Sequence, residues 1–260
     1  MFEGNASPLS QQGIEAATNR LGVAPAALWA VLTVETSGCG FLPDRRPKIL
    51  FERHWFSRLT NRRFDAQAPD VSNPIAGGYG SGGVFQYDRL AKAIKLDRAA
   101  ALKSTSWGLG QVMGFNATKV GFANVNALVA ASQESENAQL QAMVGYIEQA
   151  HIAQYLRDAD WAKFAFNYNG QDFQKNKYDE KLDLNHKRFL HGPLPDLTVR
   201  TAQMGLMLLG YGGPGFVDGW FGTNTQKAVL KFQANEGLER TGMADDPTLK
   251  KIAGKLNWAI

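Results

Sequence analysis

The segment from Pro25 to Thr36 restricts the fold more than any other part of the chain, because nearly all of its residues are apolar. Pro25 stands where a first-turn proline belongs in a helix, and Gly22 and Gly38 mark the two ends. A helix that is apolar on nearly every side is buried on most of them, so other elements must pack around it. We therefore expect this helix to lie inside a sizeable, mainly helical domain.

The rest of the first 190 residues fits that expectation. Residues 48–56 alternate between apolar and polar types, which predicts a short strand or extended segment leading to a polar helix over 57–64. Residues 65–83 are rich in glycine and proline and predict a long loop, which in a compact domain is usually functional or disordered. Helical patterns follow over residues 87–94, 97–103, 110–113, 117–120, 125–131, 135–156, 160–168 and 172–190.

The length of 260 residues suits one large domain and one small one. The run His-Gly-Pro-Leu-Pro, which begins at His191, has the composition of a short stiff linker. Beyond it, residues 199–209, 223–235 and 246–256 form three helical patterns separated by glycine-rich turns. We predict a domain over 1–190, a linker over 191–197 and a small three-helix bundle over 198–260.

Composition excludes several classes of protein. Cys39 is the single cysteine, so neither a disulfide framework nor a cysteine-built zinc site can form within the chain. No basic leader and no run of about 18 apolar residues is present, so we expect synthesis in a cytoplasm without an export signal or membrane insertion. The net charge of +4 favours a polyanionic partner, and nucleic acid, lipid headgroups and bacterial wall polymers all qualify.

Glu35 is the strongest candidate for a catalytic group. Leu28, Leu32 and Glu35 share one stripe of the apolar helix, so this carboxyl group points into or beside a core. Burial and the negative end of the helix dipole both raise its pKa, as a general acid for glycosidic cleavage requires. The alternative is that Glu35 turns out into solvent or pairs with an arginine nearby, at position 45, 46 or 53.

Three ordered motifs give a resemblance to known enzymes. The runs Glu-Thr-Ser-Gly from Glu35, Ser-Trp-Gly-Leu-Gly-Gln-Val-Met from Ser106 and Phe-Asn-Tyr-Asn-Gly from Phe166 resemble the signatures of the goose-type lysozyme and lytic transglycosylase superfamily. The Arg-Pro-Lys-Ile-Leu-Phe-Glu-Arg-His stretch within residues 34–56 more closely resembles the N-acetylmuramidase family of phage endolysins. The resemblance covers about residues 8–190 and implies a lysozyme-like helical domain.

The resemblance also assigns roles to single residues. It implies that Glu35 is the catalytic acid, that Ser106, Gly108 and Gln111 line the sugar cleft, and that Tyr168 and Asn169 lie near the acid. Each has a structural alternative. Gly108 and Gly110 can simply permit a tight turn, and Tyr168 can be a core residue with a bonded hydroxyl.

A second carboxylate would serve as the base for hydrolysis by water. Glu52 is our candidate, because a strand returning past the end of the first helix could bring it to Glu35. The alternative is a salt bridge to Arg53 or Arg46, and Asp44, Asp65 and Asp70 are further candidates for the base. Transglycosylase members of the superfamily manage with one Glu and use a hydroxyl of the substrate, so transglycosylation stays open.

The last 60 residues carry a second resemblance. The pattern from Asp218-Gly219-Trp220-Phe221-Gly222 through Phe232-Gln233 to Gly242 resembles the small three-helix peptidoglycan-binding domain. Most of these residues are scaffold, because the glycines permit turns and the apolar side chains form an inner stripe. We expect wall contacts from Asp218, Phe221, Thr225 and Gln233.

Together these features predict a monomeric phage endolysin that hydrolyses the β-1,4 bond between N-acetylmuramic acid and N-acetylglucosamine, with no metal, cofactor or nucleic acid. It would act on the wall in the periplasm after the membrane is permeabilised. The four histidines lack paired zinc-ligand spacing, and Gly78, Gly80 and Gly83 lack the βαβ setting of a nucleotide site. Two rivals stay open, namely a Cys39–His54 dyad and a wall-binding protein without turnover.

Overall fold

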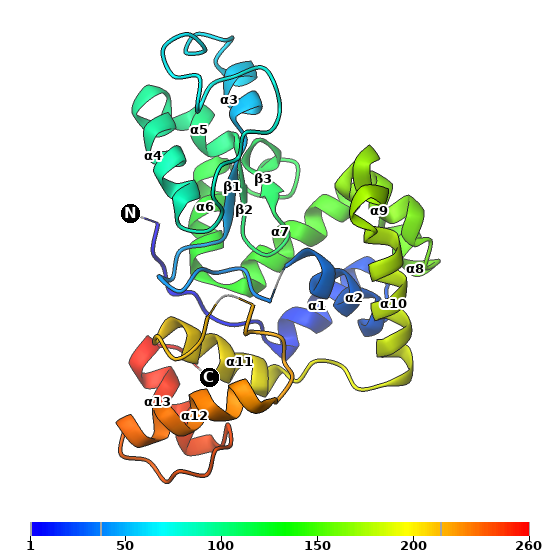
Figure 1. The fold of residues 1–260 in the computed structure, drawn as a ribbon. Coiled ribbons are helices and arrows are strands. Elements are labelled where there is room, and N and C mark those ends of the chain that lie inside the picture. Colours follow the sequence, from blue (N-terminus) through cyan, green and yellow to red (C-terminus); the bar gives the residue numbers. More distant parts are fainter. Residues whose placement is uncertain (1, 37, 214, 260) are drawn as a thin grey trace.

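The computed structural model describes residues 2–36, 38–213 and 215–259. Its N-terminal part consists of two lobes with a C-terminal module beneath them (Figure 1). The apolar segment forms α2 (Pro25–Glu35), in which every residue from Ala26 to Leu32 is buried. α2 packs most extensively against α10 (Tyr178–His191), so the most apolar segment of the chain is covered by other helices as its composition requires.

The first lobe is helical and surrounds α2. Its core holds apolar side chains from α1, α2, α7, α8, α9 and α10. Aside from the two helices already given, its elements are α1 (Gln11–Leu21), α7 (Glu136–Gln149), α8 (Ala153–Arg157), α9 (Trp161–Asn169) and η2 (Gln171–Asn176). Oxygen-bearing side chains begin three of these helices, since Ser10, Ser135 and Asp160 accept backbone N–H groups that have no partner within the helix.

The second lobe contains a three-stranded antiparallel sheet in the order β1-β2-β3. Its register pairs Ile49 with Trp107 and Trp107 with Val112, so the sheet ends in a tight hairpin at residues 108–111. Helices cover the sheet and share its apolar core. The elements are β1 (Ile49–Phe51), α3 (Arg53–Leu59), α4 (Phe85–Leu96), α5 (Arg98–Lys103), β2 (Thr105–Trp107), β3 (Val112–Met113), η1 (Gly114–Asn116) and α6 (Val125–Glu134).

The structure corrects several expected elements. Residues 110–113 belong to the β2–β3 hairpin rather than to a helix, and the expected strand over 48–56 ends at Phe51 because α3 begins at Arg53. The expected helix over 135–156 is two helices, since His151 adopts a left-handed conformation that interrupts it. Helix α1 has no counterpart among the expected elements.

The C-terminal module consists of α11 (Leu197–Leu208), α12 (Thr223–Asn235) and α13 (Asp246–Leu256). Its core includes Phe232 and Ile252 from its own helices and also Ala6, Cys39 and Phe41 from the N-terminal part. Trp258 near the end of the chain donates its indole N–H to the carbonyl of Asn5 at 3.0 Å. The module is therefore seated on the first residues of the chain as well as joined through the predicted linker. We keep the division into 1–190, 191–197 and 198–260 as a proposal.

No helix in the described ranges is long and apolar enough to cross a membrane.

Candidate active site

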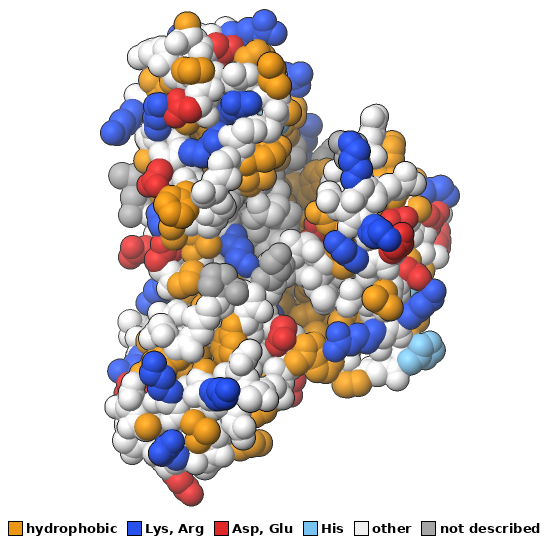
Figure 2. Space-filling view, viewed as in Figure 1, with side chains coloured by type: hydrophobic (Ala, Val, Ile, Leu, Met, Phe, Trp, Pro, Cys, Tyr) orange, Lys and Arg blue, Asp and Glu red, His pale blue; other side chains and the backbone are white. Residues whose placement is uncertain are grey.

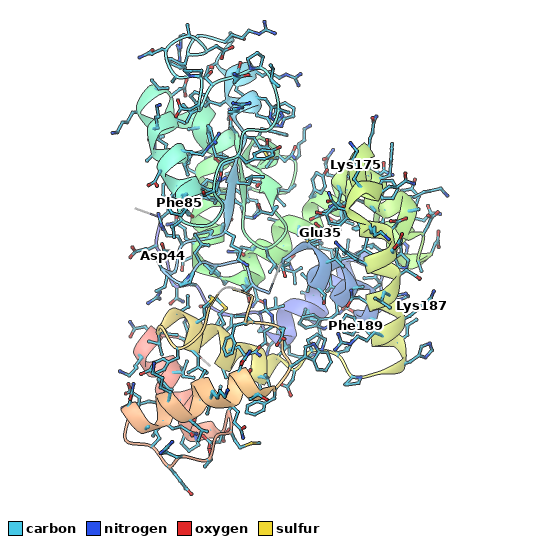
Figure 3. All side chains as sticks on the ribbon, in the orientation of Figure 1. Glu35, Asp44, Phe85, Lys175, Lys187 and Phe189 are labelled. Carbon is cyan, nitrogen blue, oxygen red and sulfur yellow. The ribbon has the colours of Figure 1, made fainter. Side chains whose placement is uncertain are left out.

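Glu35 is the last residue of α2 and lies at the edge of a hollow between the two lobes (Figures 2 and 3). Residues 26–32 of this helix are buried, and the Glu35 side chain is only partly exposed. Burial raises the pKa of Glu35 to about 7, and a hydrogen bond from Asn169 offsets part of that rise. The carboxyl group therefore keeps its proton under mildly acidic conditions, which is the state that a general acid needs.

Asn169 and Tyr168 end helix α9 and face the carboxyl group from the other side. The side-chain nitrogen of Asn169 donates to Oε1 and Oε2 of Glu35, at 3.1 and 3.2 Å. The Tyr168 hydroxyl donates to the carbonyl of Gly110 at 2.9 Å. Burial, with the nearby Glu35 charge adding to it, raises the pKa of Tyr168 well above its usual value, so the phenol stays a donor. α9 thus links the acid on one lobe to the β2–β3 hairpin on the other.

The hairpin itself fixes Gln111. Gln111 adopts a φ of 48°, and its side-chain oxygen accepts a hydrogen bond from the Ser106 hydroxyl at 2.9 Å while its nitrogen donates to the carbonyl of Gly108 at 2.8 Å. Gln111 is exposed and Ser106 is 5% exposed. Ser106 therefore holds Gln111, and Gln111 is the member of this hairpin that can face a ligand.

Gly108 has a packing role at the same turn. Its φ is +67°, and a Cβ atom there would lie 2.5 Å from Cδ of Gln139 on α7. Oε1 of Gln139 in turn accepts the backbone N–H of Leu109 at 2.8 Å. The structural alternative for Gly108 therefore has direct support, since both backbone angle and close approach require glycine.

Glu52 lies between β1 and α3, with partners separate from those of Glu35. Its Oε2 atom is 3.1 Å from Nδ1 of His54, and the side chain is 16% exposed. Tyr79 also forms a hydrogen bond with it. Burial raises the pKa of Glu52, although the charges of His54 and Arg89 and the Tyr79 hydroxyl oppose that rise. The alternative, a salt bridge to Arg53 or Arg46, does not hold this carboxylate, because Arg46 pairs with Asp44 and Arg53 lies against Gly78.

Comparisons with known proteins identify the family of this chain. The N-acetylmuramidase family model matches residues 24–190, which is more than half of the chain. This chain belongs to the N-acetylmuramidase family. A peptidoglycan binding domain model matches residues 196–252 of the same muramidase. The crystal structure of the Burkholderia AP3 phage endolysin is 41% identical, with a TM-score of 0.66 over 70% of this chain and 70% of that one. The comparison with curated proteins gave no match.

The family match confirms the expected fold class, a mainly helical lysozyme-like domain with a short β segment and a small helical module. It also identifies the muramidase as a peptidoglycan-cleaving enzyme. In the described part of the chain, no group of three or more His, Cys, Asp or Glu side chains is placed to hold a metal ion.

Tyr79, which bonds Glu52, is a candidate site residue that our sequence reasoning did not single out. It belongs to the glycine-rich segment 77–83, and Gln86 fastens this segment by donating to the carbonyl of Tyr79 at 2.7 Å. The other end of the Gln86 amide accepts the N–H of Phe51 at 3.1 Å, at the end of β1. The only signal in the sequence was that a loop of this length is often functional.

Cys39 does not have the environment of a nucleophile. Its side chain is 2% exposed and lies in the core shared with the C-terminal module, and its Sγ donates to the carbonyl of Phe41. Burial raises the pKa of the Cys39 thiol, and the Glu136 charge raises it further. His54, its suggested partner, lies beside Glu52. These contacts oppose the cysteine-dyad reading, because the reactive species is the thiolate.

The C-terminal module corrects two of the four expected wall contacts. Gln233 is fully buried, and its amide donates to Thr241, Met243 and Thr248. Thr225 is 2% exposed and accepts a hydrogen bond from Gln203 at 3.0 Å. Neither side chain can reach a polymer, because both hold the module together from inside.

The other two expected contacts lie at the surface of the module. Asp218 is exposed but uses Oδ1 to accept the N–H of Trp220 at 2.9 Å. Phe221 is 38% exposed, so part of its ring is open to a ligand at the surface of the module. Phe221 is therefore the expected wall contact whose surroundings best suit that role.

Proposed function

We propose that this muramidase is a phage endolysin that hydrolyses the β-1,4 bond between N-acetylmuramic acid and N-acetylglucosamine in peptidoglycan. The observation that carries the proposal is Glu35, a carboxyl group whose pKa burial raises to about 7 at the edge of the hollow. A proton must reach the glycosidic oxygen as its bond to C1 breaks, and a carboxyl group that is still protonated at mildly acidic pH can deliver it.

The roles around the acid follow from the contacts. Glu35 gives its proton to the leaving oxygen, and Asn169 keeps the carboxyl group in place and stabilises the carboxylate that forms. Glu52 takes a proton from the water that attacks C1, and burial, by raising the Glu52 pKa, makes it a stronger base. Inversion requires the two carboxyl groups to lie about 6.5 to 9.5 Å apart, with room for that water.

The proposal also covers where the protein is made and where it acts. It is made in the host cytoplasm as a monomer and reaches the wall once the membrane has been permeabilised. The similar phage endolysin of known structure and the peptidoglycan binding domain match support this setting. The module then holds the enzyme on an insoluble polymer and raises the local concentration of glycan strands.

Product analysis tests the proposal. Purified protein should clear a suspension of permeabilised Gram-negative cells, and mass spectrometry of the released fragments should show reducing N-acetylmuramic acid ends. The variant Glu35→Gln should bind walls without clearing them. Anhydro ends would establish transglycosylation instead, and binding without clearing by the unaltered protein would establish a wall-binding protein.

A further inference from the structure

The C-terminal module meets the N-terminal part through a buried ion pair. Arg200 on α11 is 3% exposed, and Glu136, the first residue of α7, is fully buried. Arg200 donates to Oε2 of Glu136 through one terminal nitrogen and to Oε1 at 2.8 Å through the other. The pair joins the segment that matches the muramidase model to the segment that matches the peptidoglycan binding model.

Glu136 also accepts hydrogen bonds from two backbone N–H groups of the N-terminal part. It accepts the N–H of Gly40 at 2.9 Å and the N–H of Leu9 at 3.0 Å. Burial by itself would raise the pKa of Glu136, but the Arg200 charge and these hydrogen bonds together hold it below its usual range. Glu136 therefore stays ionised in the interior, and it depends on Arg200 to do so.

Arg200 has one more contact, and that contact is with the segment that follows Glu35. Its second terminal nitrogen donates to the carbonyl of Gly38 at 2.9 Å. A Cβ atom on Gly38 would lie 3.0 Å from the carbonyl oxygen of Val217 in the module, and one on Gly40 would lie 1.7 Å from Oε1 of Gln139 on α7. The segment from Gly38 to Gly40 is thus held between the module on one side and α7 on the other.

This segment is attached to the end of α2. Thr36 caps the helix by donating its N–H to the carbonyl of Leu32 at 3.2 Å, and the Lys48 ammonium donates to the carbonyl of Thr36 at 3.1 Å. The N–H of Lys48 donates to the carbonyl of Gly40 at 2.7 Å. Any shift of the Gly38–Gly40 segment therefore reaches the residue next to Glu35 through a few short contacts.

We propose that Arg200 is a positioning residue for the muramidase reaction, through which the seated module fixes the Gly38–Gly40 segment and the orientation of Glu35. This inference rests on the proposed role of Glu35 as the acid. Arg200 does not touch the substrate and acts through the segment that it holds. The module then has two effects, one on wall binding and one on the chemical step.

Full-length variants test the coupling. Arg200→Met removes the guanidinium, and Arg240→Met is its control, since Arg240 is an exposed arginine of the same module. The double variant Glu136→Gln with Arg200→Met avoids a buried charge without a partner and so protects the fold. Arg200→Lys should rescue part of the effect, because an ammonium supplies charge without the paired donors. Thermal unfolding identifies the variants that are folded.

The first measurement follows Glu35 directly and does not require turnover. A ¹³C NMR titration of the glutamate carboxyl groups gives the Glu35 pKa, with the signal assigned by its loss in Glu35→Gln. We expect it to move from about 7 by about half a unit or more in the folded Arg200→Met and double variants, and by less in Arg200→Lys. It should not move in Arg240→Met.

The second measurement separates catalysis from binding. On soluble, uncrosslinked glycan strands, the Arg200→Met and double variants should lose about tenfold or more in kcat, since small displacements of a catalytic group cost this much. Pull-down on insoluble walls should be unchanged.

An unmoved Glu35 titration with unchanged kcat in the double variant would overturn the coupling and leave the module as a tether. If the unaltered protein does not cleave the strands, the proposed function fails, and the titration still decides whether Arg200 positions Glu35.

Discussion

Asn169, the last residue of α9, donates its side-chain amide to both carboxylate oxygens of Glu35, at 3.1 and 3.2 Å. The bond stabilises the charged form of the acid and opposes the effect of burial on its pKa. One side chain therefore limits how far the pKa of Glu35 rises. This hydrogen bond also leads to a prediction of how the activity depends on pH.

The variant Asn169→Leu should move the alkaline limb of the activity profile upward. The acid works while protonated, so activity of the unaltered enzyme should fall as pH rises through about 7. Without the amide, the pKa of Glu35 should rise and the limb should shift by about one unit. The measurement is kcat/KM against pH, with Asn167→Leu as control because Asn167 bonds within its own helix. A limb that stays in place would contradict this role of Asn169.

The variant Glu35→Gln should stabilise the protein at high pH. A raised pKa means that the folded state holds the proton more tightly than the unfolded chain, so stability falls as pH rises from 4.5 to about 7 and the penalty is complete above that range. Removing the ionisable group should gain about 3 kcal/mol at pH 8 and close to none at pH 4. Urea unfolding at both pH values checks this, and Glu15→Gln on the exposed face of α1 should gain at neither.

The variant Tyr79→Phe should affect the acidic limb of the profile. The Tyr79 hydroxyl lowers the pKa of Glu52, so its loss should raise that pKa. A base works when deprotonated, and the acidic limb should therefore move up by about half a unit, with kcat/KM at low pH falling about threefold. Ile75→Ala is the control within the same loop, as Ile75 is 69% exposed. If Glu52 takes no part in the reaction, Tyr79→Phe will leave this limb unaltered.

The variant Gln233→Leu should destabilise the C-terminal module. The buried amide donates to three groups and accepts the N–H of Gly242 at 2.9 Å, so an apolar replacement leaves several polar groups without partners. We expect a loss of about 2 to 4 kcal/mol in the free energy of unfolding. Gln226→Leu, on the exposed face of the same helix, should change it by less than about 0.5 kcal/mol. Equal effects of the two changes would show that Gln233 has no special structural role.

The variant Phe221→Ala should weaken attachment to walls and leave the chemistry alone. The exposed ring offers an apolar face of the kind that packs on sugar rings, and its loss should reduce the bound fraction about three- to tenfold in a pull-down. Turnover of soluble strands should not change. Met243→Ala, on another exposed apolar residue of the module, provides the comparison. Equal losses from both changes would mean that Phe221 makes no specific contact.

Local patterns in the sequence predicted part of the fold closely. The apolar run after Pro25 gave α2, and the stripes of the module gave α12 and α13 with the bounds that the structure has. The hairpin at Gly108–Gln111 was missed, because two residues of β3 are too few to show an alternation. A single sequence records periodicity well but says little about pairs of distant strands.

The candidate site was likewise predicted only in part. Glu35 was predicted because a carboxyl group interrupts an apolar stripe. The resemblance implied that Asn169 lies near the acid, and the structure shows the two side chains in contact. Glu136 and Arg200 were missed, since each looks like an ordinary polar residue of a helix and their pairing spans 64 positions. Gln233 was assigned to the wall from the sequence pattern of the module, which does not show that its side chain is buried.

The hydrogen bond from Trp258 to Asn5 joins the residues after α13 to the segment before α1. A ribosome releases residue 5 long before residue 258, so this bond forms only after the module has been made, whereas the contacts of residues 6–9 with residues 133–136 can form earlier. The two muramidase lobes can fold earlier, but their interface with the module forms last. If this interface positions Glu35, the newly made enzyme gains full activity only once the whole module has been made, and a chain cut short before Trp258 stays weak.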